Sequence, residues 1–142
     1  MRRSQAGQIT AMLVLFAICL LLTIIAVTDV SAAYLRRQSA TSLADGAALA
    51  ATTAATAGVV YGSADDRYVD IDQASASAAV EQYLRDTGAY QTYPGLQCAV
   101  GVRGHVVTVQ LTMPFKLPVP VPGVAASTLV HGSGSAELPI YQ

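Results

Sequence analysis

The chain has 142 residues, a length that allows one ordinary domain, or a membrane segment with a small domain, and excludes a large multidomain enzyme. Hydrophobic residues make up 53% of it and charged residues only 12%, about half the share usual in soluble proteins. Eight Lys and Arg against nine Asp and Glu give a net charge of -1, so the strong positive field that nucleic acid binding needs is missing. No nucleic acid partner is expected.

The hydrophobic excess is concentrated near the N-terminus, in twenty uncharged residues from Ile9 to Thr28. As a helix, this segment is about 30 Å long, which matches the hydrocarbon core of a bilayer. We therefore expect residues 9–28 to form a single transmembrane helix after a cytoplasmic tail of residues 1–8. The alternatives are a buried core helix and a signal peptide cleaved near Val30-Ser31-Ala32, although the apolar region of a signal peptide usually has only about 7–15 residues.

The basic residues that flank the span are nearly balanced, with two arginines on each side. Residues 1–8 are too few to fold outside the cell, and the chain after Thr28 has six basic groups against nine acidic ones. The positive-inside rule then favours a single-pass protein of the cell membrane with its N-terminus in the cytoplasm and residues 29–142 outside.

The helix is expected to continue beyond the bilayer, because residues 29–57 contain no proline and nine of the eighteen positions from 40 to 57 are alanine. A single helix over residues 8–57 would be about 75 Å long; the alternative is a break near Asp29 or the Arg36-Arg37 pair. Small residues at every fourth position would let another helix or a sheet approach closely. This small-residue stripe, the predicted helix-packing interface, consists of Gly46, Ala50, Ala54 and Gly58.

Several features follow one another in a specific order along the first third of the chain. Gly7-Gln8 comes after a short basic head and precedes the apolar span, and Asp29, Tyr34 and the arginine pair come after the span. The segment SLADGAALAA then runs from Ser42 to Ala51. This order resembles the TadE/TadG-like family, whose members are pseudopilin-like components associated with assembly of Flp-type tight-adherence pili in bacteria.

The resemblance implies a short-form, membrane-anchored component of the bacterial cell envelope. It would act like a minor pseudopilin in assembling or anchoring a Flp-type pilus or a related secretion apparatus. Its expected partners are the lipid bilayer and other pilus-assembly or pseudopilin subunits. Gly7 becomes the candidate site of prepilin-type processing, although that pattern has a glutamate five residues later, where this chain has Met12.

The residues beyond the span suit the edge of a membrane. Asp29 needs water or a partner there, Tyr34 is amphipathic, and Arg36 and Arg37 can meet lipid headgroups. The alternative for Asp29 is a solvated carboxylate just beyond the bilayer.

Residues 58–142 are expected to form a small extracytoplasmic α+β domain. After a loop with the sequence GSADDRYVDID, Asp70 and Gln73 fit a capping box that begins a second helix, and Gly88 ends it. The apolar stripe of that helix should pack on a small sheet. It contains Ala76, Ala79, Val80, Tyr83 and Leu84.

Three strands should complete this domain as an antiparallel sheet, giving a pilin-like α+β layout. Residues 96–102 and 105–113 predict a hairpin around Arg103-Gly104, and residues 127–138 predict the last strand. Alternation predicts one apolar face in the second strand, made by Val107, Val109, Leu111 and Met113. Prolines should keep the segment after Met113 out of any central strand and make it an extended connector. They are Pro114, Pro118, Pro120 and Pro122.

The sequence lacks the motifs GxSxG, HExxH, Walker A and GxGxxG, so we expect no catalytic residues, no cofactor and no small-molecule substrate. Residues 132–135, Gly-Ser-Gly-Ser, are interpreted as a flexible or bulged strand. No metal site is expected either, because two groups of potential ligands have simpler interpretations. His105 and His131 near Cys98 are more simply exposed strand residues. The acidic residues of the 65–72 loop, which lacks the glycine of an EF-hand, are more simply solvated side chains and a helix cap.

Two questions stay open from the sequence alone. Cys98 is either a buried apolar residue or half of an intermolecular disulfide. The alternative function is an exported, signal-anchored binding module, which the acidic loop and the extended connector from Met113 to Gly123 would support.

Overall fold

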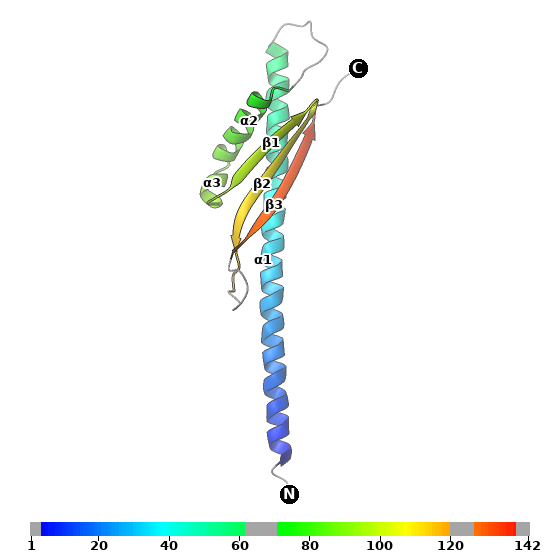
Figure 1. Cartoon of the computed structure of the whole chain (residues 1–142), viewed down its shortest axis with the longest axis vertical. Coiled ribbons are helices and arrows are strands. Elements are labelled where there is room, and N and C mark those ends of the chain that lie inside the picture. The colour runs from blue at the N-terminus through cyan, green and yellow to red at the C-terminus, as the bar shows by residue number, and fades with distance from the viewer. Residues whose placement is uncertain (1–3, 62–70, 120–126, 139–142) are drawn as a thin grey trace.

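The computed structural model describes residues 4–61, 71–119 and 127–138, with side chains of the first helix described from Gly7 to Ala55. The protein has the expected α+β fold: a long N-terminal apolar helix, a further helix and a three-stranded antiparallel sheet. Figure 1 shows the sheet beside the C-terminal half of the long helix, whose N-terminal half extends alone. The elements are α1 (Ser4–Tyr61), α2 (Gln73–Asp86), α3 (Ala89–Thr92), β1 (Gln97–Arg103), β2 (Val106–Lys116) and β3 (Ser127–Glu137).

Helix α1 is continuous over 58 residues, about 87 Å at the rise of an α-helix. The predicted continuation beyond the apolar segment is confirmed, and the helix does not break at Asp29 or at the Arg36-Arg37 pair. Alanine favours this continuity, because its side chain loses no entropy in a helix and brings no polar group into the interior.

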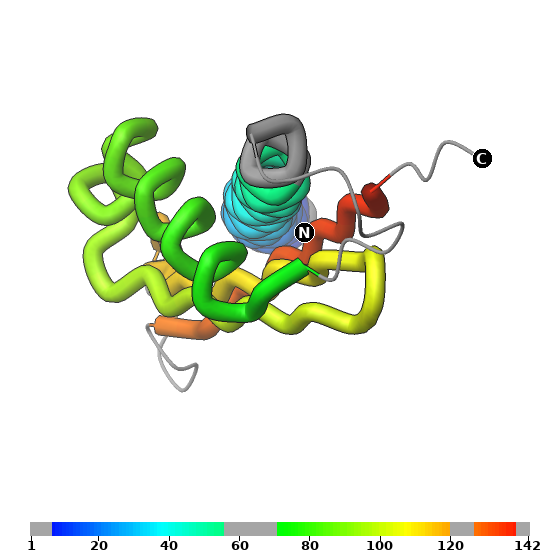
Figure 2. Tube along the Cα trace, turned by 90° about the horizontal axis from the view of Figure 1, so that it is seen from above, coloured from blue at the N-terminus to red at the C-terminus, as the bar shows by residue number. Residues whose placement is uncertain are grey.

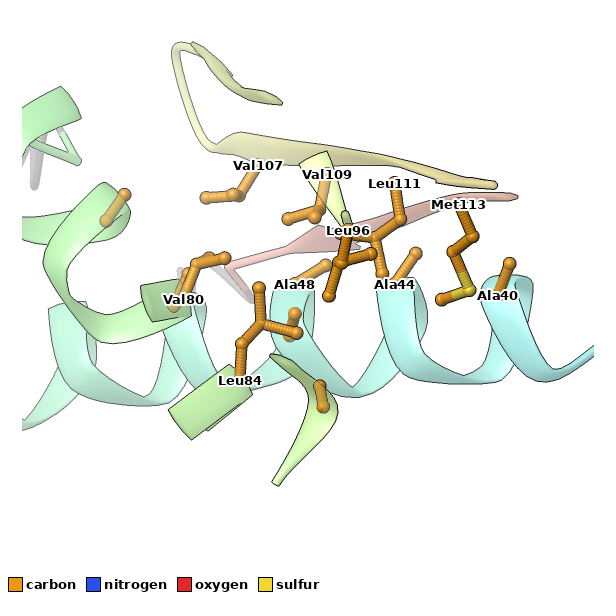
Figure 3. Packing of buried hydrophobic residues seen from close by; sticks show 14 of the residues in the cluster. Ala40, Ala44, Ala48, Val80, Leu84, Leu96, Val107, Val109, Leu111 and Met113 are labelled. Atoms are coloured by element: carbon orange, nitrogen blue, oxygen red, sulfur yellow. The ribbon is translucent and has the colours of Figure 1, made fainter. Parts of the chain in front are cut away.

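The core lies between α1, α2 and the sheet. The predicted apolar face of β2 is confirmed, since Val107, Val109, Leu111 and Met113 are all 0% exposed. In Figure 3 these side chains point from β2 toward α1, which meets them with small side chains at Ala40, Ala44 and Ala48. Helix α2 adds its own buried stripe from the side. That stripe consists of Ala76, Val80 and Leu84, with Ala79 and Tyr83 half-buried.

Two glycines of β3 let this strand lie directly against the α1 backbone. A Cβ atom added to Gly132 would overlap the backbone of Ala40, and one added to Gly134 would overlap the backbone of Ala44 and Asp45. Two strand residues advance about 6.8 Å and four helical residues about 6 Å, so alternate glycines match successive turns of the helix. Residues 132–135 therefore belong to a regular strand, and their interpretation as a flexible or bulged segment is wrong.

Helix α2 begins two residues later than its sequence suggested. Its N-cap is Asp72, whose Oδ2 accepts hydrogen bonds from the Ser75 backbone N–H at 2.9 Å and from the Ser75 hydroxyl at 3.0 Å. These bonds hold the pKa of Asp72 below its usual value, because they stabilise the charged carboxylate. The predicted cap, Asp70, lies outside the described residues. The helix ends as predicted, with Gly88 in the left-handed conformation just beyond it.

Gln73 has a different role from the one predicted for it in a capping box. Its Nε2 donates to the Val100 carbonyl at 2.7 Å, and its Oε1 accepts from the Val102 N–H at 3.1 Å. Strand β1 is an edge of the sheet, with order β1-β2-β3, so this amide occupies backbone groups that another strand could otherwise pair with.

The predicted strands and hairpin are confirmed, but β2 extends to Lys116 and includes Pro114. The expectation that Pro114 lies outside the central strand is therefore wrong. Strand β1 pairs with β2 only as far as Gln97 opposite Thr112, so beyond this point β2 has a partner on one side alone. Proline is tolerated on such a locally unpaired edge. Pro118 follows the strand, and Pro120 and Pro122 lie outside the described residues.

Candidate assembly surface on the long helix

The N-terminal half of α1 is an apolar cylinder with no partner among the described residues. Its most apolar window of eighteen residues has a mean hydropathy of 2.9 and no buried residue. By length and composition this helix is able to cross a membrane. Gly7 and the residues after it are exposed up to the end of the apolar segment, apart from a half-buried Ile25.

Asp29, directly after the apolar segment, contacts the folded domain. Its Oδ1 accepts a hydrogen bond from the backbone N–H of Val119 at 3.3 Å. Val119 lies in the connector that follows β2, ninety residues farther along the chain. The carboxylate therefore has a partner within the chain and holds the end of the sheet against α1.

The two arginines predicted to lie at the membrane edge have different environments. The guanidinium of Arg36 lies over the ring of Tyr93, with its Cζ 4.8 Å from the ring centroid, and 5.9 Å from the centroid of Phe115. Arg37 is exposed, and so is Tyr34. Arg36 thus links α1 to Phe115 of the sheet and to Tyr93 in the segment before the sheet. The side chains of Arg37 and Tyr34 are exposed and can contact a membrane surface or a partner.

This difference gives a testable prediction. Replacing Arg36 by Met should lower the free energy of unfolding by about 1–2 kcal/mol, because two partly desolvated cation–π contacts are lost. The matched variant Arg37→Met removes the same charge from an exposed position and should change stability by less than about 0.5 kcal/mol. Chemical denaturation of the full chain in detergent, followed by circular dichroism, measures both. Equal losses would show that the ring contacts contribute nothing.

The small-residue stripe divides into two parts. At Gly46 the space is already occupied, since an added Cβ would overlap the Tyr83 hydroxyl of the chain's own α2. Ala50 is half-buried and Ala54 is exposed, while Gly58 lies in α1 beyond the described side chains. The open part borders an apolar groove between α1 and α2, which we call the α1 groove. It is lined by Gly46, Leu49, Ala50, Thr53, Ala54 and Tyr83.

Sequence reasoning missed the most prominent side chain of this groove. Leu49 is 63% exposed, although it lies in the half of α1 that packs on the domain. Figure 2, viewed along α1, shows why: the sheet and α2 surround one side of the helix and leave its other side uncovered. A leucine three residues after Gly46 was visible in the sequence, but which face α2 would cover was not.

Comparison with known families gives a match in the N-terminal region. Residues 7–64 match the family model described as "Putative Flp pilus-assembly TadE/G-like". The chain is TadE/G-like over this region. The resemblance predicted from the sequence is therefore confirmed, and it supports a role related to pilus assembly. The match covers the apolar segment, the membrane-edge residues and the small-residue stripe. No curated protein and no solved structure matches the chain.

The remaining candidate residues follow the TadE/G-like region in the sequence, and those that the structure describes lie on different elements. His131 is exposed, and its Nδ1 lies 3.0 Å from the Thr112 hydroxyl. His105 is in the turn between β1 and β2, and Cys98 packs against the core. The described residues contain no group of three or more His, Cys, Asp or Glu side chains placed to hold a metal ion. Asp65, Asp66 and Asp70 lie outside the described residues.

Cys98 is half-buried beside the core of the domain. Burial raises the pKa of its thiol, with a smaller contribution from the negative charge of Glu81. A protonated, half-buried thiol reacts slowly, so this environment favours the apolar interpretation of Cys98 over an intermolecular disulfide.

Proposed function

We propose that this chain is a membrane-anchored, non-enzymatic component, similar to a minor pseudopilin, that acts in assembling or anchoring a Flp-type pilus or a related secretion apparatus. The observation that carries the proposal is the division of α1. One half of this continuous helix is apolar and uncovered, and the other half forms a wall of a packed domain. With residues 9–28 in the bilayer and the N-terminus in the cytoplasm, the helix tethers the domain close to the outer surface of the membrane.

The α1 groove is the surface that we assign to a neighbouring subunit. Leu49 lies 21 residues beyond Thr28, about 32 Å from the end of the apolar segment, and is therefore in water. There the burial of Leu49 and of the adjoining Tyr83 would contribute hydrophobic free energy to association. The small side chains of Ala50 and Ala54 would allow a partner helix to approach closely.

Leu49→Arg tests this assignment. The variant should abolish co-isolation of other pilus-assembly components from detergent-solubilised membranes of the host, because the partner would have to bury an unpaired charge. Leu49 is exposed, so the fold should be retained. Gly46→Leu would be a poor test, because the new side chain would displace the chain's own Tyr83.

The matched control is Gln110→Arg, which places the same charge on an exposed position of the sheet. It should leave co-isolation unchanged. Undiminished co-isolation with Leu49→Arg would refute the α1 groove as the assembly surface. The alternative of a signal-anchored binding module receives less support from the connector, because Met113 is buried and the Val119 N–H is bonded to Asp29.

A further inference from the structure

One end of the sheet lies at the level where the apolar segment of α1 stops. Val119 is hydrogen-bonded to Asp29, the residue after Thr28. The first residues of β3 lie beside the next two turns of α1, since Leu129 shares a shallow depression with Val30 and Tyr34. In Figure 1 this end of β2 and β3 is the part of the sheet nearest to the N-terminal half of α1.

The height of this end can be compared with the thickness of a bilayer. The headgroup layer on each side is about 5–8 Å thick, being half the difference between the whole bilayer and its hydrocarbon core. Asp29 lies one residue, about 1.5 Å, beyond the apolar segment, so Val119 falls within this layer. A tilt of about 20° moves a point 10 Å from the helix axis by only about 3 Å in height, which keeps Val119 at the membrane surface.

The chemistry of this end suits a lipid surface. The sequence from residue 117 to residue 130 contains no charged residue. Apolar and amphipathic side chains are exposed together at this end of the sheet, with Leu129 60%, Val30 69% and Tyr34 66% exposed. Such residues favour the boundary between headgroups and acyl chains, where an amphipathic tyrosine is common.

Two basic groups adjoin this apolar surface. Lys116 is exposed at the end of β2, and Arg37 lies two turns beyond Asp29 on α1. Both are placed to reach anionic headgroups, because long basic side chains extend toward the interface.

We infer that the end of the sheet formed by Leu117–Val119 is a second membrane contact, seated in the lipid headgroup layer, with Leu129 and Tyr34 of α1 at the outer boundary of that layer. This inference rests on the proposed anchoring of residues 9–28. One helix alone would leave the domain free to rotate about the membrane normal and to change its tilt. A second contact restricts the tilt, and it presents the α1 groove to neighbouring subunits at a constant height.

The chain contains no tryptophan, so single tryptophans can report depth in the membrane. The full chain is reconstituted in vesicles of phosphatidylcholine with about 20% phosphatidylglycerol, an anionic lipid, with or without lipids brominated near the top of the acyl chain. The tryptophan of Val119→Trp should emit at a shorter wavelength than that of Gln110→Trp, and brominated lipid should quench most of its fluorescence. Leu22→Trp, inside the apolar segment, should also be quenched, and Gln110→Trp, on the distant part of the sheet, should not.

The three variants separate the inference from the proposed anchoring. Quenching at Leu22→Trp with none at Val119→Trp would overturn the second contact and leave the anchor intact. Absence of quenching at both positions would overturn the anchor as well. If Val119→Trp disturbs the fold, Leu129→Trp gives the same test from a side chain that is already exposed, and quenching above that of Gln110→Trp is the expected result.

Discussion

Replacing Gly134 by Ala is expected to separate β3 from α1 and to cost about 3 kcal/mol or more of the free energy of unfolding. The added methyl group would overlap the backbone of Ala44 and Asp45. Overpacking of a core usually costs about 1–3 kcal/mol, because side chains can rotate or shift. Here the obstacle is the backbone of a long helix, which cannot move away without opening the interface. Thermal unfolding of the full chain in detergent, followed by circular dichroism, measures the loss.

Gly101→Ala is the matched control for this substitution. Gly101 is also a strand glycine, but the nearest atom to its added Cβ is the Thr108 carbonyl oxygen at 4.0 Å, an ordinary contact. Its replacement should leave stability unchanged or raise it slightly, since alanine has fewer conformations to lose on folding. If both variants unfold at the same temperature as the wild type, β3 does not pack on α1 as described.

The second large effect is expected in the apolar segment. Twelve of the twenty residues from Ile9 to Thr28 are Leu, Ile, Val or Phe. On a membrane-insertion scale these contribute about -4 to -7 kcal/mol, whereas each lysine near the helix centre costs about 2.5–3.5 kcal/mol. The double variant Ile18→Lys, Leu21→Lys should therefore cancel most of the driving force for insertion. We expect most of the protein to leave the carbonate-washed membrane fraction.

The control for this pair keeps the positions and removes the charge. Ile18→Leu with Leu21→Ile preserves the hydrophobicity of the segment and should remain in the membrane as the wild type does. Full retention of the double lysine variant would contradict a transmembrane location for residues 9–28.

The strongly periodic parts of the fold could be predicted from sequence. Helix α1 follows from the absence of proline and the density of alanine, and β2 follows from strict alternation at Val107, Val109, Leu111 and Met113. These signals are local, because the spacing of the residues alone decides which face is buried. The TadE/G-like resemblance could also be recognised from the sequence, because its features occur in a fixed order.

The predictions that were wrong or incomplete share one physical cause: the structure at those residues depends on a distant part of the chain. Pro114 is tolerated in β2 because β1 stops pairing at Gln97, and no local pattern gives the length of β1. Gly132 and Gly134 suggested flexibility until α1 was placed against them. The partner of Asp29 is ninety residues away and could not be inferred from residue type.

The candidate site shows the same limit. Small residues at every fourth position of α1 predicted a helix-packing interface, and for a partner subunit this stays a prediction. The structure shows that Tyr83 of the same chain already covers Gly46. The part that we assign to a partner is the stretch from Leu49 to Ala54, and identifying it required the position of α2.

In the proposed function, residues 9–28 remain attached and anchor a folded outer domain to the membrane. Intact mass and N-terminal sequence of the chain recovered from fractions of its own host test this anchoring. We expect a chain in the membrane fraction that begins at Met1 or, after prepilin-type processing, at Gln8. A soluble chain that begins near Ala33 would contradict it, because the apolar half of α1 would then be a signal peptide.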